Sequence, residues 1–136
     1  KLIPGLELSK KDNVVLVEDE NKKFITVNKE PYFFYYEDKM VPTLKLLQTK
    51  DLLKKITVDM GAIKFVVNGA DVMRPGITKI QESIEKNDFI VIVDENHQKP
   101  LAIGIALLST EEMEKASSGK VIKNIHYVGD EIWKLE

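Results

Sequence analysis

The residues best suited to bind a ligand lie in one short stretch, GAIKFVVNGADVMRPGI, at positions 61–77. It holds three of the chain's seven glycines and its lone arginine, Arg74. A glycine in the first turn of a helix, such as Gly61, leaves backbone N–H groups open to an anion such as a phosphate. Gly69 and Gly76 let a ligand approach the backbone without meeting a Cβ. The planar guanidinium of Arg74 can clamp a phosphate or stack on a base.

A short helix, a turn and a strand are expected to position these residues. Asp59 is a suitable N-cap, and the apolar positions of MGAIKFVVNG (60–69) fall on one helical face. Glycine tolerates the left-handed conformation, so Gly69 is expected to end the helix. ADVM then begins a strand that carries Met73, a soft apolar surface for a base, and RPG turns it.

The same pattern also has a purely structural explanation. Glycines allow a helix to pack tightly on a strand, and Arg74 would then simply lie in solvent. The stretch lacks the lysine and the spacing of a phosphate-loop nucleotide site. The residues alone leave both explanations open.

Composition restricts the class of protein. The chain has 136 residues, of which 31% are charged and 43% apolar, which suits one globular domain or two small ones. It contains no cysteine, which excludes disulfides, thiolate zinc sites and cysteine nucleophiles. The longest apolar runs, near 90–93 and 101–108, have the length of strands and not of membrane spans. We therefore expect a cytoplasmic protein without contact to a membrane.

No combination of side chains indicates catalysis or a metal. The carboxylates of EDE (18–20) and EEMEK (111–115) are expected on a turn and on an exposed helix, where they are solvated. His97 and His126 are far apart in sequence, and two such histidines do not make a metal site. We expect His126 to be packed or hydrogen-bonded. The prediction is a non-enzymatic protein without cofactor.

Charge is distributed unevenly along the chain. The net charge is −2, made up of +2 in residues 1–55 and −4 in residues 56–136. A protein that binds nucleic acid by general electrostatics is strongly basic. Any contact with a polyanion must therefore depend on a few residues that fit a defined shape, or must use the more basic first half.

The first half is predicted to be strands followed by a helix. VVLVED (14–19), KKFITVN (22–28) and YFFYYED (32–38) are rich in β-branched and aromatic residues and are separated by polar turns. The aromatic block favours a small core over a base-stacking platform, although the side chain of Tyr32, Phe34 or Tyr36 could instead be exposed for stacking.

A helix is predicted to follow these strands. The segment VPTLKLLQTKDLLKK (41–55) changes to helical spacing, with Pro42 in its first turn. This half is too short to be stable alone, so we expect it to dock on the second.

The second half is predicted to be mainly strands. KITVD (55–59) precedes the opening motif, while DFIVIVDE (88–95) and PLAIGIALLS (100–109) are continuously apolar, as in strands covered on two faces. STEEMEKASSG (109–119) has a capping box, Ser109 with Glu112, and is expected to be a short helix. KVIKNIHYVG and EIWKLE (131–136) are expected to pair around a Gly-Asp turn, with Trp133 closing a barrel.

Three sequence blocks resemble a known family. VDMGAIKFVVNGADVMRPGI is similar to the signature of the PUA domain, an RNA-binding pseudobarrel of pseudouridine synthases and archaeosine transglycosylases. Together with ITVNKEPYFFYYEDKMVPTLKLL and IKNIHYVGDEIWKL, it resembles the malignant T-cell amplified sequence family, in which a pre-PUA module precedes the PUA domain. The resemblance spans roughly residues 14–136 and is of an archaeal type. The N-terminal helix of the family is expected to be missing or divergent in the first dozen residues.

The resemblance implies an α+β fold and a site. A small α/β pre-PUA module would occupy residues 1–55 and a PUA-type β pseudobarrel with short helices residues 56–136. RNA binding without catalysis is implied, through the first helix of the pseudobarrel, the glycine loop after it and the next strand. The corresponding residues are Gly61, Ala62, Lys64, Phe65, Asn68, Gly69, Ala70, Val72, Met73, Arg74, Pro75 and Gly76.

The resemblance also implies partners. These are tRNA or ribosomal RNA, the small ribosomal subunit and a density-regulated partner protein, in translation initiation or recycling. The acidic balance of the second half favours docking on a defined structure such as a tRNA acceptor end. Two alternatives remain: a protein–protein adaptor, and a targeting subunit for an RNA-modifying enzyme.

Overall fold

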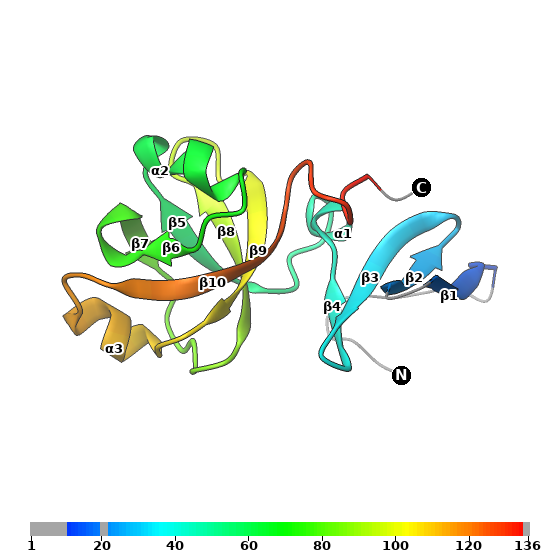
Figure 1. The fold of residues 1–136 in the computed structure, drawn as a ribbon, viewed down its shortest axis with the longest axis horizontal. Coiled ribbons are helices and arrows are strands. Elements are labelled where there is room, and N and C mark those ends of the chain that lie inside the picture. The colour runs from blue at the N-terminus through cyan, green and yellow to red at the C-terminus, as the bar shows by residue number, and fades with distance from the viewer. Residues whose placement is uncertain (1–10, 20–21, 135–136) are drawn as a thin grey trace.

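The computed structural model describes residues 11–19 and 22–134, which form two β-sheets side by side along the long axis of the molecule (Figure 1). The α+β class predicted above is confirmed. The first ten residues of the module expected over 1–55, and the last two of the strand expected over 131–136, lie outside the described ranges. Within those ranges, no helix has the length and apolar character that crossing a membrane requires.

The smaller sheet is an antiparallel meander in the order β1-β2-β3-β4. The turn between β2 and β3 is Asn28-Lys29 and that between β3 and β4 is Glu37-Asp38, and all four residues have positive φ. That backbone conformation is the one that tight hairpins need. The last hairpin is a correction, because YFFYYED was assigned to one strand up to residue 38. The strands are β1 (Val14–Asp19), β2 (Lys22–Val27), β3 (Glu30–Tyr36) and β4 (Lys39–Pro42).

The larger sheet has six strands in the order β6-β10-β9-β8-β5-β7 and curls on itself (Figure 1). All its pairs are antiparallel except β5 with β8, which is parallel. The sequence indicated most of these strands but not β7, which is short and half exposed. The strands are β5 (Lys54–Val58), β6 (Val72–Met73), β7 (Ile77–Ile80), β8 (Phe89–Asp94), β9 (Pro100–Ala106) and β10 (Lys120–Tyr127).

The continuous apolar run of β8 is explained by two hydrophobic cores. Ile90 and Ile92 face the core inside the curled sheet, whereas Val91 and Val93 face a second core that they share with the smaller sheet. Because strand side chains alternate between faces, a strand buried on both sides has no polar positions. The second core includes Phe34 of the smaller sheet. The prediction that the first half docks on the second is therefore confirmed.

The helices are short. They are α1 (Leu44–Leu47), α2 (Met60–Val66) and α3 (Thr110–Lys115), with a 3₁₀ turn η1 at Arg74–Gly76. The capping box predicted for α3 is present, because the Ser109 and Glu112 side chains each accept from the other's backbone N–H.

The long helix predicted over 41–55 is wrong. Pro42 lies in β4, where it pairs with Phe33, and Thr43 caps the four-residue helix α1 by accepting from the Leu46 amide. The hydroxyl of Thr43 also donates to the Pro31 carbonyl at 2.7 Å, which ties the start of the helix to β3. Lys54 then enters the parallel pair with β8. Sheet pairing at both ends therefore overrides the helical spacing of the leucines.

The strand predicted over 131–136 is also wrong in its described part, which forms a turn. The Asp130 carboxylate accepts from the backbone N–H groups of Tyr127 and Trp133, and these bonds close the turn. Trp133 does not close the barrel. It packs against the core between the two sheets, with Lys45 over its ring at 5.6 Å.

His126 joins the two halves at their junction. Its side chain has no exposed surface, and its Nε2 accepts from the Leu44 amide at 3.2 Å, in the first turn of α1. Its Nδ1 lies 2.9 Å from Asp130 Oδ2, so the neutral ring donates to that carboxylate. The ring also packs edge-on against Phe34 at 5.3 Å. The prediction that His126 is packed and hydrogen-bonded is confirmed.

Asp130 is held in its charged form at this junction. Burial alone would raise its pKa, but the hydrogen bond from His126 and those from the backbone amides outweigh burial. The pKa of Asp130 is therefore lowered from its ordinary value. A charged acceptor makes the bond from His126 stronger than one between neutral groups.

The junction predicts a difference between the two histidines. Replacing His126 by Leu leaves a buried amide and a carboxylate without their partner, which should lower the free energy of unfolding by about 2–3 kcal/mol. His97 is 82% exposed, so His97→Leu should change stability by less than about 0.5 kcal/mol. Urea unfolding at pH 7 measures both. Equal effects of the two substitutions would contradict the role of His126.

Candidate functional site

The start of α2 is capped by carboxylates. Asp59 is the N-cap, as predicted, and its Oδ1 accepts from the Ala62 amide at 2.9 Å. The Met60 amide donates to Glu95 Oε2 at 3.0 Å. Two N–H groups of the first turn are thus already bound to negatively charged side chains. The expectation that this end receives a phosphate through free amides is therefore not supported by the geometry, because an anion here would meet two carboxylates.

The glycines of the motif serve close packing within the chain. Gly69 has φ +90°, and a Cβ there would lie 2.9 Å from the ring of Tyr127. A Cβ on Gly76 would lie 3.3 Å from the Cβ of Ala62, so this glycine lets η1 approach α2. The structural explanation left open above applies to these two positions. Gly61 differs, because a Cβ there would meet only Asp59 Oδ1, at 3.5 Å.

An open groove lies between α2 and the β6–η1 segment. Its volume is about 530 Å³. Three large apolar side chains at or beside it are strongly exposed: Phe65 at 57%, Met73 at 50% and Met60 at 49%. Exposed apolar groups that gather at one place mark a surface that contacts a ligand, a partner or a membrane. The residues lining the groove are Asp59, Gly61, Ala62, Phe65, Val66, Ala70, Asp71, Val72, Met73, Pro75 and Gly76.

The groove contains most of the site residues expected from the sequence and leaves out four. Lys64, Asn68, Gly69 and Arg74 do not line it. Lys64 is exposed with its ammonium 5.2 Å from the Phe65 ring, and Asn68 donates to the Lys64 carbonyl at the end of α2. Asp59, Val66 and Asp71 line the groove but were not predicted as site residues.

Arg74 points away from the groove. Its Nε–H donates to the Met113 carbonyl in α3 at 2.6 Å, and its Nη1–H donates to the Ile77 carbonyl at 3.3 Å. The guanidinium therefore anchors α3 to η1 and is not a free fork for a phosphate. A sequence motif cannot reveal this contact, because Met113 is distant along the chain.

Strand β10 pairs with β6 beside the groove and supports it without lining it. The Asn124 amide group donates to the Val66 and Ala70 carbonyls, both at 3.0 Å, and so holds the end of α2. The backbone N–H of Asn124 donates to Asp71 Oδ1 at 2.8 Å. Lys120, paired with Met73 in register, places its ammonium 3.0 Å from Asp71 Oδ2.

Asp71 is charged in this arrangement. Burial opposes ionisation, but the bond from the Asn124 amide and the nearby Lys120 and Lys123 ammonium groups outweigh it and lower the pKa of Asp71. Among the described residues, none that lines the groove is a lysine or arginine. The groove is therefore apolar with acidic edges, and the two cations that act on Asp71 stand outside it on β10.

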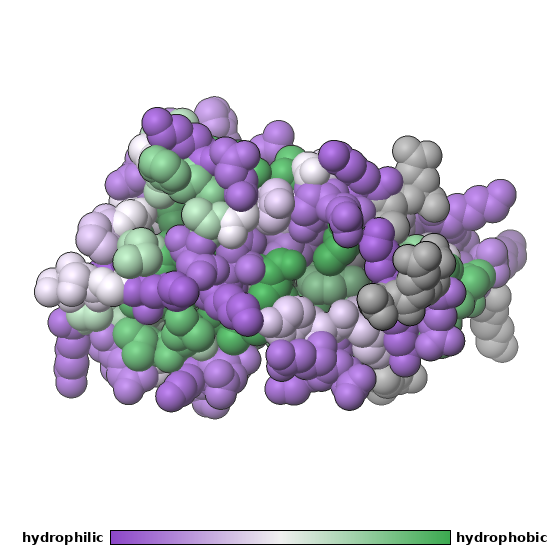
Figure 2. All heavy atoms as spheres, viewed as in Figure 1, coloured by the Kyte–Doolittle hydropathy of each residue, from purple (hydrophilic) through white to green (hydrophobic). Residues whose placement is uncertain are grey.

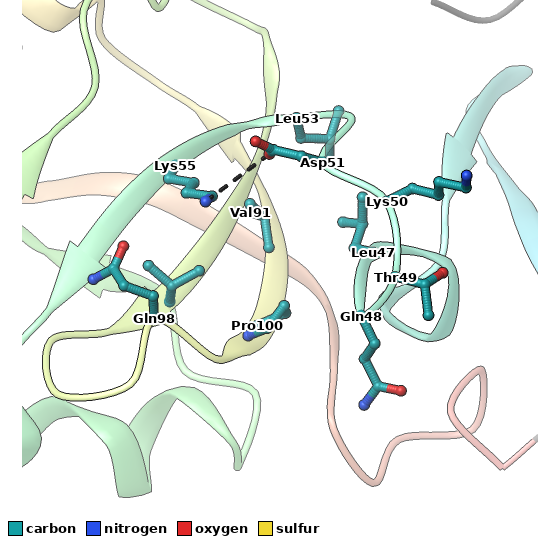
Figure 3. Close-up of a pocket in the computed structure, with 11 residues that line it drawn as sticks. Leu47, Gln48, Thr49, Lys50, Asp51, Leu53, Lys55, Val91, Gln98 and Pro100 are labelled. Atoms are coloured by element: carbon teal, nitrogen blue, oxygen red, sulfur yellow. Dashed lines mark ion pairs between the residues drawn. The ribbon is translucent and has the colours of Figure 1, made fainter. Parts of the chain in front are cut away.

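A second hollow lies where the two sheets meet (Figure 3). It has a volume of about 260 Å³, with Val91, Pro100 and Leu47 in its walls. An ion pair between Asp51 and Lys55, 4.0 Å apart, spans one side of it. The described residues contain no cluster of three or more His, Asp or Glu that could hold a metal ion.

Comparison with known proteins identifies the family. Residues 54–128 match the PUA domain, and residues 3–50 match a domain of unknown function, DUF1947. The rat malignant T-cell-amplified sequence 1 protein is 37% identical over 145 residues, covering 98% of this chain and 80% of that protein. The chain belongs to the PUA-domain proteins of the malignant T-cell-amplified sequence family. The prediction of that resemblance is confirmed.

Other relatives agree with this assignment. A Methanocaldococcus jannaschii protein is 50% identical over 131 residues, covering 95% of this chain and 80% of its own length. The Saccharomyces cerevisiae translation machinery-associated protein 20 is 36% identical, covering 94% of this chain and 75% of that protein.

Solved structures support the fold. A Pyrococcus horikoshii protein matches with a TM-score of 0.81 at 38% identity, covering 93% of this chain and 81% of that chain. A chain in an archaeal box H/ACA sRNP Nop10–Cbf5 complex matches with a TM-score of 0.57 at 29% identity, covering 69% of this chain and 29% of that one. The larger sheet is thus a PUA-type pseudobarrel, as predicted.

The position of Arg74 leads to a prediction about stability. Arg74→Lys keeps the charge but loses the planar group that bonds two carbonyls, so it should lower the free energy of unfolding by about 1–2 kcal/mol. Lys64→Gln, at an exposed position, should leave it within about 0.5 kcal/mol. Urea unfolding measures both. If Arg74→Lys instead leaves the free energy of unfolding unchanged and weakens RNA binding, Arg74 contacts the RNA directly.

Proposed function

We propose that this protein binds RNA without catalysis, and that an unpaired nucleotide enters the groove between α2 and β6. The observation that carries the proposal is the gathering of exposed Phe65 and Met73 at a groove with acidic edges. The two regions expected at 1–55 and 56–136 then act as a pre-PUA module and the RNA-binding PUA domain.

The chemistry of the groove favours a base and ribose over a phosphate. A base has an apolar face that can lie against an aromatic ring or a thioether, and such stacking contributes about 1–3 kcal/mol for each base. Carboxylates such as those of Asp59 and Asp71 accept hydrogen bonds from exocyclic amines and ribose hydroxyls. A phosphate gains neither contact and is repelled by both carboxylates.

The RNA is proposed to be tRNA or small-subunit ribosomal RNA, in translation initiation or recycling. The name of the yeast relative places that protein with the translation machinery, and the sRNP neighbour belongs to an RNA-containing assembly. The net charge of −2 argues against indiscriminate binding to any polyanion. A single-stranded end, such as a tRNA acceptor end, provides unpaired bases on a defined structure. A cytoplasmic location at the small ribosomal subunit follows from this proposal.

A second candidate function is that of a protein–protein adaptor. Strand β1 lies at the edge of the smaller sheet, and its Val14, Val15 and Leu16 are 52%, 41% and 52% exposed. An exposed apolar edge strand is a site where another polypeptide can pair. In this second proposal, a density-regulated partner protein binds at β1.

Substitution at the groove tests the RNA proposal. Phe65→Ser and Met73→Ser should each weaken binding of a hairpin with a single-stranded 3′ end about tenfold, because each removes an apolar contact to a base. Both side chains are exposed, so folding should be unaffected. Leu16→Ser is the matched control, since it removes an equally exposed apolar side chain from β1.

Fluorescence anisotropy with the overhanging hairpin and with its blunt form measures these affinities. The wild type should prefer the overhang, and the groove variants should lose that preference. Equal binding of both hairpins by the wild type would refute the proposal. A loss of affinity in Leu16→Ser as large as in the groove variants would also refute it.

A further inference from the structure

Two cations that act on Asp71, at the acidic edge of the groove, lie on β10 outside the groove itself. Lys120 and Lys123 are the two ammonium groups that lower the pKa of Asp71. If a base occupies the groove, the phosphates joined to its nucleotide must lie elsewhere. Two cations beside the groove's acidic edge are where a phosphodiester would be stabilised.

A bulge brings both lysines to the same face of β10. The register of β10 against β6 shifts between Lys120 and Ile122. As a result Val121 and Ile122 are both buried, at 1% and 0% exposure, whereas Lys120 and Lys123 are both exposed. In a regular strand, residues three positions apart point to opposite faces. The bulge instead leaves both lysines exposed in a row along the strand, with Cα atoms at most about 10 Å apart at about 3.3 Å per residue.

The end of this row lies beside the smaller sheet. The ammonium of Lys123 is 5.8 Å from the ring of Tyr36 in β3, and a hydrogen bond with the Tyr36 side chain raises the pKa of Lys123. Tyr36 is half-buried and packs edge-on against Phe89 at 6.4 Å. Figure 2 shows this face, with hydrophilic side chains in a band over β10 and apolar ones beside it near α2 and β6.

We propose that an RNA strand leaves the groove across β10, with its phosphodiester on Lys120 and Lys123 and the next base against Tyr36. This second nucleotide subsite spans both sheets and rests on the proposed function. The ligand of the subsite is the unpaired nucleotide adjacent to the one in the groove. Lys120 exchanges its contact with Asp71 for the phosphate, while Lys123 and Tyr36 keep theirs to each other.

The inference predicts a dependence on RNA length. Lys120→Gln with Lys123→Gln should leave the affinity for a single nucleoside unchanged and weaken binding of a single-stranded pentanucleotide on the order of tenfold. The slope of log affinity against log salt should fall by about 0.7 for each lysine that contacts a phosphate. A merely structural role of the lysines would not alter that slope.

Controls separate this subsite from general electrostatics and from misfolding. Lys86→Gln with Lys115→Gln removes the same charge from exposed positions in the β7–β8 connection and in α3 and should change neither affinity nor slope. Lys123→Arg keeps the cation and should bind the pentanucleotide like the wild type. Tyr36→Leu should weaken pentanucleotide binding without changing the salt slope. Urea unfolding verifies that each variant is folded.

The outcomes distinguish this inference from the proposed function. A pentanucleotide affinity and salt slope unchanged by the β10 substitutions, with nucleoside binding retained, would overturn the subsite and leave the groove proposal intact. Failure of the wild type to bind either ligand, or binding that Phe65→Ser does not affect, would overturn both. If the β10 variants and the control variants lose the same affinity for the pentanucleotide, the lysines attract the RNA only through general electrostatics. That result would also overturn the subsite.

Discussion

The hydrogen bonds of the buried His126 ring hold the two halves of the molecule together. One ring nitrogen accepts from the first helical amide of α1 and the other contacts Asp130, which closes the C-terminal turn. Two residues earlier on the same strand, Asn124 fixes the end of α2 through two backbone carbonyls. Strand β10 therefore positions both the smaller sheet and one wall of the groove. A core shared by both sheets packs around this junction.

The hydrogen bonds and charges around the groove determine what it can bind. Two amides in the first turn of α2 donate to the Asp59 and Glu95 carboxylates, so the geometry does not favour the anion site that a glycine-rich helix start suggests. What remains for a ligand is an apolar surface with carboxylates at its edges and cations on the neighbouring strand. That distribution of charge suits the face of a base and the hydroxyls of a ribose, with the phosphate outside.

Short-range features of the fold could be predicted from the sequence, and long-range contacts could not. The Asp59 cap, the capping box of α3 and the apolar strands β8 and β9 depend on neighbouring residues, and all were predicted. The helix over 41–55 was wrong because β-pairing of Pro42 and Lys54, which leucine spacing does not report, limits α1 to one turn. The same reason applies to Arg74 and Gly69, whose partners Met113 and Tyr127 lie far along the chain. Most apolar groove residues were predicted, but Val66 and Asp71 were not. Lys120 comes to lie beside Asp71 only through the pairing of β6 with β10.

The most direct test of the account is to map where a nucleoside and inorganic phosphate bind by NMR. Methyl and aromatic signals of Met73, Phe65 and Ala62 should shift when adenosine or cytidine is added and should stay unchanged with inorganic phosphate at the same concentration and ionic strength. Shifts of the Met60, Gly61 and Ala62 amide signals on addition of phosphate alone, with none from the nucleosides, would contradict it. They would place an anion at the start of α2, where the structure has two carboxylates.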